Sequence, residues 1–147
     1  LLNDPQLLIV DEPTVGLDPE ERVRFRNLLS DLSGQRIVIL STHIVSDVES
    51  TASDIAIINK GQLKVRARPE QLLKQMEGSV WEWMVPSDEV SVIKKQFLLS
   101  STLRRMDGVV VRVVSSVQPC PDARPVTPNL EDVYLAMVAQ NHQGVPQ

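Results

Sequence analysis

The sequence predicts an α/β fold, with helices packed on a parallel sheet in the first part of the chain and a small α+β unit after it. Apolar runs alternate with amphipathic stretches over residues 1–66, and this pattern changes near residue 67. The chain has 147 residues, of which 42% are hydrophobic and 23% charged, so it is long enough to bury a core. We therefore predict two domains, 1–77 and 78–147.

Composition excludes several classes of protein. Fifteen basic and nineteen acidic side chains give a net charge of −4, which argues against a dedicated nucleic-acid binder. The single cysteine, Cys120, excludes an internal disulfide and suits a reducing compartment. No apolar run approaches the ~20 residues that cross a bilayer. The start, Leu1–Pro5, lacks Met and resembles a helix end, so we expect the chain to begin inside a larger protein.

The first strands and helices follow from local signals. Leu7–Val10 is a continuous apolar run, which is typical of a strand covered on both faces. A helix should begin with Asp18 as its N-cap and end near Gly34. Ile37–Leu40 is predicted to be a second buried strand, and a short helix is expected over residues 46–53.

A hairpin should follow, because the apolar run Ile55–Ile58 leads through the turn Asn59–Gly61 into the strand Gln62–Arg66. Beyond it, Trp81 and Trp83 alternate with a charged residue and so share one face. Core packing is the favoured interpretation of this pair, and a partner-binding face is the alternative. We expect a helix over 69–77, a strand over 79–85, a helix over 87–99, a strand over 109–114, a proline-rich loop, and a helix over 130–140.

Two adjacent carboxylates, Asp11 and Glu12, end the first apolar strand. Ligands of an open parallel sheet bind beyond the carboxyl ends of its strands. An aspartate there can hold Mg²⁺, through water or directly, because this cation prefers oxygen ligands. The neighbouring glutamate can orient or deprotonate a water molecule. The alternative is that both residues simply begin a polar loop.

A histidine, His43, follows the second apolar strand. If the two strands are parallel, His43 lies on the same sheet edge as Asp11 and Glu12, where it can donate a hydrogen bond to a phosphate. By itself, such a histidine is more often an ordinary hydrogen-bonding residue. Similarly, Gly16 and Asp18 are by themselves explained by a turn and a helix cap.

Together these stretches are far more specific. Leu-Leu-Ile-Val-Asp-Glu-Pro-Thr, Gly-Leu-Asp-Pro-Glu and Leu-Ser-Thr-His, at these spacings, resemble the second half of an ABC-type nucleotide-binding domain, a P-loop NTPase fold. The resemblance implies that Asp11 is the Walker B aspartate supporting Mg²⁺ and that Glu12 is the catalytic glutamate. Gly16 and Asp18 match the D-loop, which touches the partner subunit across the nucleotide. His43 matches the switch histidine that contacts the γ-phosphate.

The resemblance covers about residues 1–77, and Leu130–Leu135 more loosely resembles the terminal helix of drug- or polymer-export ATPases with an accessory domain. It implies an ATP- and Mg²⁺-dependent subunit that hydrolyses ATP to power transmembrane transport. The implied partners are an integral membrane permease and a second ATPase subunit in a head-to-tail dimer, with no nucleic acid. The implied location is cytoplasmic, on the inner face of the cell membrane.

Two alternatives stay open: a soluble ABC-type ATPase that acts on nucleic acid or ribosomes, and a non-enzymatic dimerisation or regulatory remnant. The phosphate cradle of the family, Gly-x-x-x-x-Gly-Lys-Ser/Thr, is missing, because none of the six glycines precedes Lys-Ser or Lys-Thr. The Q-loop and signature loop would lie upstream of Leu1. Leu32–Gln35 resembles the signature but lacks a glycine and follows the Walker B strand, so we expect it only to end a helix. We expect the chain alone to be inactive.

Overall fold

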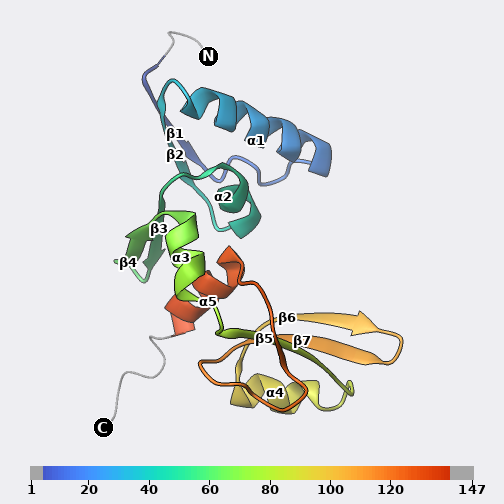
Figure 1. Ribbon diagram of the computed structural model, residues 1–147. Helices are drawn as coiled ribbons and strands as arrows, with labels where there is room; N and C mark the ends of the chain where they lie inside the picture. The colour runs from blue at the N-terminus through green and yellow to red at the C-terminus, as the bar shows by residue number, and fades with distance from the viewer. Residues whose placement is uncertain (1–4, 140–147) are drawn as a thin grey trace. The chain divides into compact units, whose positions relative to one another are not determined.

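A computed structural model of the protein describes residues 5–139, so residues 1–4, where a helix end was predicted, and Gln140 lie outside the described part. The chain divides into two compact units, 1–53 and 54–147 (Figure 1). The domain boundary near residue 77 stays a prediction. Within residues 5–139, every helix is too short or too polar to cross a membrane.

The first unit has two parallel strands and two helices, and its mixed α/β architecture agrees with the predicted fold class. In register, Leu7 lies opposite Ile37 and Asp11 opposite Ser41, so both strands end at the same edge of the sheet. Its elements are β1 (Leu7–Asp11), α1 (Pro19–Ser33), β2 (Ile37–Ser41) and α2 (Val45–Thr51).

Helix α1 begins and ends where the sequence predicts. The Asp18 carboxylate accepts a hydrogen bond from the Glu21 backbone N–H at 2.8 Å, and the Glu21 carboxylate accepts one from the Asp18 N–H at 3.4 Å. This reciprocal capping box satisfies two of the unpaired N–H groups at the helix start. At the other end, Gly34 caps the helix, and the Gln35 N–H donates to the carbonyl of Leu32 at 3.1 Å. The signature-like stretch therefore ends a helix, as expected.

The expectation that both strands are covered on both faces is wrong. Burial alternates along β1 and β2, and one face of the sheet is uncovered: Ile9 is 65% and Ile37 66% exposed, and Leu7 and Ile39 lie beside them about half exposed. The cause is architectural, because α1 and α2 of this unit lie along the other side of the strand pair (Figure 1). The continuous apolar run is typical of a strand that can be covered on both faces, and within the first unit α1 and α2 cover one of them.

The second unit contains a hairpin, a four-stranded antiparallel sheet and three helices. The hairpin turns at Lys60 and Gly61, whose φ angles of 50° and 73° suit a tight two-residue turn. The sheet order is β6-β7-β5-β8, and α5 packs against α3 and β6. The elements are β3 (Ile55–Asn59), β4 (Gln62–Ala67), α3 (Pro69–Gln75), β5 (Val80–Val85), α4 (Val90–Gln96), β6 (Leu98–Arg105), β7 (Gly108–Val114), β8 (Arg124–Pro125) and α5 (Leu130–Ala139).

The predicted helix over 87–99 is wrong at its C-terminal end. Helix α4 ends at Gln96, and β6 begins at Leu98 and forms a hairpin with β7, with Leu103 opposite Val110. The hairpin supplies ladder hydrogen bonds and cross-strand contacts to a segment whose own apolar pattern is ambiguous. The short strand β8 was likewise not predicted, because it lies in the proline-rich stretch and pairs only through two residues.

The tryptophans belong to the core, as the favoured interpretation predicts. Trp83 is 9% exposed and packs edge-to-face on Phe97 with ring centroids 6.1 Å apart. Trp81 packs against the same cluster, and its indole N–H donates to the carbonyl of Ser115 at 3.0 Å. The tryptophans of β5 therefore help to hold the four-stranded sheet of the second unit together.

A buried ion network ties α5 to this sheet. Arg112 of β7 donates from Nη2 to Asp132 of α5 at 2.7 Å and from Nη1 to Glu82 of β5 at 2.7 Å. Asp132 is fully buried, and it also accepts a hydrogen bond from the backbone N–H of Asn129 at 3.0 Å. The N–H of Asp132 in turn donates to the side-chain oxygen of Asn129 at 2.9 Å, so the two residues cap the start of the helix reciprocally.

This network makes an acid-stability prediction. Burial alone would raise the pKa of Asp132, but Arg112 and the Asn129 N–H stabilise the carboxylate and hold its pKa below 3.8. A lowered folded-state pKa stabilises the fold above the unfolded value, and this stabilisation is lost as the pH falls through the folded value. Urea midpoints should therefore hold from neutral pH to about pH 4 and then fall. In Asp132→Asn the fall below pH 4 should be shallower, and an unchanged acid limb would contradict the assignment.

Candidate functional site

The candidate site lies at the carboxyl edge of the β1–β2 sheet. Asp11 is the last residue of β1, Glu12 follows it, and His43 lies two residues beyond the end of β2. The backbone N–H of Glu12 donates to the carbonyl of Ser41 at 2.7 Å, which continues the parallel ladder past the strand end. The structure thus brings the two carboxylates and the imidazole to the same edge, as the sequence predicts for parallel strands.

The Glu12 carboxylate is held by the turn that follows β2. Its Oε1 accepts the His43 backbone N–H at 3.0 Å and lies 2.8 Å from the ring atom Nδ1 of the same histidine. Its Oε2 accepts the Thr42 hydroxyl at 3.1 Å. The Glu12 side chain is 34% exposed and that of His43 is 74% exposed, so a ligand from solution can reach both.

Two properties of Glu12 are unusual. Its φ angle is 45°, in the left-handed region that a glutamate rarely adopts and that costs about 1–3 kcal/mol where the surroundings impose it. The hydrogen bond from the His43 side chain, followed by that from Thr42, holds the pKa of Glu12 below its usual 4.5 despite the opposing effect of burial. The carboxylate is therefore ionised at neutral pH and aimed at the β2 turn.

The donor set at this edge suits a magnesium ion shared with phosphate. Asp11 is exposed at the tip of β1, so water or a phosphate-bound cation can reach it. Among residues 5–139, no three His, Cys, Asp or Glu side chains gather closely enough to hold a metal by themselves. Mg²⁺ at phosphate sites is commonly held by one or two carboxylates, water and the phosphates, so a single aspartate fits this chemistry.

Gly16 and Asp18 lie in the loop that joins Glu12 to α1. Gly16 has φ 83°, and the Leu17 N–H donates to the Thr14 carbonyl at 3.2 Å, which closes a turn that needs a residue with positive φ. Asp18 caps α1, so the simple helix-cap interpretation holds for it. The roles of both residues toward nucleotide or partner stay predictions.

Sequence analysis did not identify a buried polar pair beneath this site. The Thr14 hydroxyl donates to a carboxylate oxygen of Asp47 in α2, and both side chains are 1% exposed. The two residues are 33 positions apart, so no local pattern joins them. The only sequence signal is an acid in the first turn of α2, which is ordinary at a helix start.

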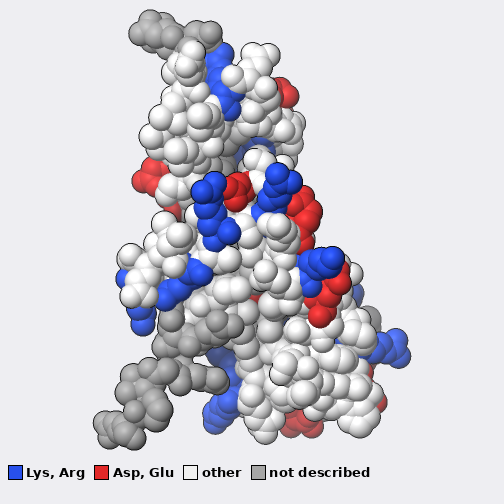
Figure 2. Space-filling view, turned by 60° about the vertical axis from the view of Figure 1, so that its left-hand side comes forward, with Lys and Arg blue, Asp and Glu red and all other residues white. Residues whose placement is uncertain are grey.

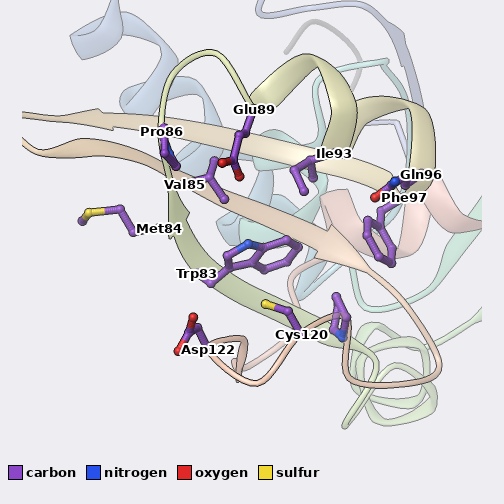
Figure 3. Close-up of a pocket in the computed structure, with 11 residues that line it drawn as sticks. Trp83, Met84, Val85, Pro86, Glu89, Ile93, Gln96, Phe97, Cys120 and Asp122 are labelled. Atoms are coloured by element: carbon purple, nitrogen blue, oxygen red, sulfur yellow. The ribbon is translucent and has the colours of Figure 1, made fainter.

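The second unit contains a groove of about 430 Å³ beside β5, α4 and the loop over 119–122. Figure 3 shows Trp83 at its centre, with Cys120 close by and the acids Glu89 and Asp122 on opposite sides in this view. Trp83 and Phe97 also belong to the packed core of this unit, so the groove marks the edge of that core.

The surface charges are mixed. On the face shown in Figure 2, basic and acidic side chains of the described residues lie interspersed, without one large basic patch. Such a distribution is unlike the basic stripe by which proteins track the phosphates of nucleic acids.

Comparisons with known proteins find sequence similarity to ABC transporter ATP-binding proteins. No protein-family model matches the sequence. An uncharacterised ABC transporter ATP-binding protein of Bacillus subtilis (strain 168), YhcH, is 29% identical over 160 residues, covering 99% of this chain and 51% of the relative. The Nod factor export ATP-binding protein I of Rhizobium leguminosarum bv. viciae is 38% identical over 79 residues, covering 53% of this chain and 25% of the relative. The chain is thus related to the ATP-binding proteins of ABC transporters, as the motifs predict.

A solved structure titled as the ATP-binding subunit of an ABC transporter is 27% identical, with a TM-score of 0.44, covering 49% of this chain and 30% of that one. The chain spans about half the length of YhcH and a quarter of the length of the Nod factor export protein. The activity, substrates and partners of a whole protein are therefore matters for proposal.

Proposed function

We propose that this chain, within a complete polypeptide, forms the later part of an ATP-hydrolysing subunit that powers transport across a membrane. The observation that carries the proposal is the junction of Glu12 and His43 at the carboxyl edge of β1 and β2, next to Asp11. The sequence relationship to ABC transporter ATP-binding proteins supports the same class of function.

In this proposal Glu12 orients the attacking water and accepts its proton. Glu12 is ionised at neutral pH and can accept a proton, although the hydrogen bonds that lower its pKa also make it a weaker base. Its Oε1 accepts hydrogen bonds from both the backbone and the ring of His43, whereas its Oε2 accepts one from the Thr42 hydroxyl. Oε2 therefore keeps a lone pair that can take the proton of a bound water.

The protonation of His43 follows from its partner. An ionised carboxylate only accepts hydrogen bonds, so Nδ1 of His43 must carry the proton that faces Glu12. In a neutral imidazole, Nε2 would then be an acceptor. To donate from Nε2 to a phosphate oxygen, His43 must therefore be an imidazolium or first turn away from Glu12.

Asp11 would hold Mg²⁺, through water or directly, and Gly16 and Asp18 would face the nucleotide and the second ATPase subunit of a head-to-tail dimer. Bound Mg²⁺ would neutralise charge on the phosphate oxygens. The phosphate cradle would come from the rest of the polypeptide, so these 147 residues alone should not hydrolyse ATP. An integral membrane permease would receive the mechanical output, which places the protein in the cytoplasm against the inner face of the membrane.

The test of this proposal compares ATP hydrolysis by the complete polypeptide with ATP hydrolysis by residues 1–147 alone. We expect Mg²⁺-dependent turnover by the complete protein, and turnover at contaminant level by the fragment. Phosphoryl transfer depends on electrostatic stabilisation that the fragment cannot supply by itself. Clear Mg²⁺-dependent turnover by the fragment would contradict its expected inactivity. A complete protein without activity, even together with its membrane partner, would favour a regulatory remnant.

Affinity purification from membranes separates the transport role from its rival. We expect the complete protein to co-purify with a polytopic membrane protein. The face of residues 5–139 shown in Figure 2 has no large basic patch of the kind that binds nucleic acid. Recovery with nucleic acid or ribosomes at physiological salt, lost on nuclease treatment and without a membrane protein, would instead favour an ATPase acting on those partners.

A further inference from the structure

We propose that Thr14 and Asp47 are a positioning pair, which fixes the loop carrying Glu12 against the helix that follows His43. The inference rests on the proposed ATPase function and adds two residues to it. Neither side chain reaches the sheet edge itself, because both are 1% exposed. They would act through Glu12 and His43.

Burial sets this pair apart within the first unit. Among residues 5–53, only Thr14, Leu29 and Asp47 are buried, so two of the three most enclosed side chains are polar and bonded to each other. A carboxylate in such a place is costly unless it is hydrogen-bonded and its charge is balanced. A site that merely needed packing would be filled more favourably by apolar side chains.

The partners of Asp47 are unequal. Oδ2 accepts the Thr14 hydroxyl, whereas Oδ1 is buried without a hydrogen bond and lies 3.8 Å from Nη1 of Arg26 in α1. Arg26 therefore balances the charge from beyond hydrogen-bond distance. The Thr14 hydroxyl supplies the directional contact, and this contact joins the β1–α1 loop to α2.

Short backbone links carry this restraint to the site. Thr14 lies within the turn closed by the Val15 N–H on the Glu12 carbonyl at 3.3 Å. Asp47 is tied to the chain next to His43 by its own N–H, which donates to the Ile44 carbonyl at 3.1 Å. The Glu12 loop and the His43 turn are thus connected twice: directly through the exposed Glu12–His43 contact, and beneath it through Thr14 and Asp47.

The second connection matters because the first weakens during the reaction. Once Glu12 has accepted a proton its carboxyl group is neutral, and its hydrogen bonds to the β2 turn lose their charge assistance. The buried pair still holds the two segments in register at that stage. This predicts that losing the Thr14 hydroxyl lowers the rate of the chemical step more than it weakens ATP binding.

The test is Thr14→Val in the complete polypeptide, which removes the hydroxyl at nearly constant size. We expect kcat for ATP hydrolysis to fall about 10- to 100-fold with KM changed less than about 3-fold, the scale expected of a small misplacement of a reacting group. Thr14→Ser keeps the hydroxyl and should restore most of kcat. Thr51→Val is the matched control, because the Thr51 hydroxyl donates to the Asp47 backbone carbonyl at 2.6 Å and not to its carboxylate. It should leave kcat unchanged.

Combination with Glu12→Gln separates positioning from a merely structural role. If Thr14 acts by placing Glu12, Thr14→Val should lower kcat little further once the base is removed. Equal losses in both backgrounds, or wild-type kcat in Thr14→Val, would overturn the inference while leaving the ATPase proposal intact. A Glu12→Gln variant with wild-type kcat would instead overturn the assignment of Glu12 as the base, and absent turnover by the complete polypeptide would overturn the ATPase proposal.

Folding is measured alongside by thermal unfolding. If Thr14→Val does not fold, Asp47→Asn takes its place, because its amide keeps an acceptor oxygen for Thr14 but loses the charge facing Arg26. A folded Asp47→Asn variant should show a smaller fall in kcat than Asp47→Ala, which also loses the acceptor oxygen. KM should again be preserved. Full kcat in this folded variant, together with full kcat in Asp47→Ala, would overturn the inference.

Discussion

Replacing Glu12 with Gln in the complete polypeptide should lower kcat for ATP hydrolysis by about 10²–10⁴-fold while leaving ATP binding nearly unchanged. The amide keeps an oxygen that can accept the His43 backbone N–H and the Nδ1 proton, so the geometry of the β2 turn should survive. It cannot accept a proton from water. The measurement is steady-state hydrolysis together with nucleotide affinity.

Glu20→Gln provides the matched control, because Glu20 lies only eight positions away, in the first turn of α1, and its side chain is 74% exposed. The same chemical change there should leave kcat within about 2-fold, as expected for a surface carboxylate whose ion pair is weak. Wild-type hydrolysis and transport in Glu12→Gln would show that Glu12 is not the base.

Removing Arg112 should have the largest effect on stability. Arg112→Leu leaves Asp132 fully buried without its guanidinium, and losing one partner of a buried ion pair costs about 3–5 kcal/mol. The partners Asp132 and Glu82 hold the pKa of Arg112 above its usual value, as expected of a cation stabilised in its charged form. Urea unfolding followed by tryptophan fluorescence should report this loss, because both tryptophans of the chain lie in β5.

Arg104→Leu is the comparison, since Arg104 is an exposed residue near the end of β6 and should cost less than about 0.5 kcal/mol. Adding Asp132→Asn to Arg112→Leu removes the stranded charge and should recover part of the stability. If Arg112→Leu lowers the free energy of unfolding no more than Arg104→Leu does, the ion network contributes little to the stability of the four-stranded sheet.

Local signals predicted much of the first unit. Asp18 and Gly34 mark the ends of α1 in the sequence and in the structure, because capping depends only on neighbouring backbone groups. The meeting of Glu12 and His43 was also predictable, since parallel strands place their carboxyl ends on one edge. The functional roles of these residues remain predictions.

Long-range pairing explains what the sequence did not reveal. The segment Leu98–Arg105 forms a strand because β7 lies beside it, and its own pattern did not distinguish strand from helix. The pairs Thr14–Asp47 and Arg112–Asp132 join residues 33 and 20 positions apart, so only the fold brings them together. Likewise, an apolar run shows that a strand can be covered on both faces, but not which segment covers it.

The bare face of the β1–β2 sheet has a consequence for the life of the protein in the cell. Ile9 and Ile37 form an exposed apolar surface with their neighbours. Chaperones bind proteins that expose such surfaces, and quality-control proteases degrade them. Residues 1–147 made alone should therefore aggregate or be degraded faster than the same residues within a complete polypeptide that covers this face.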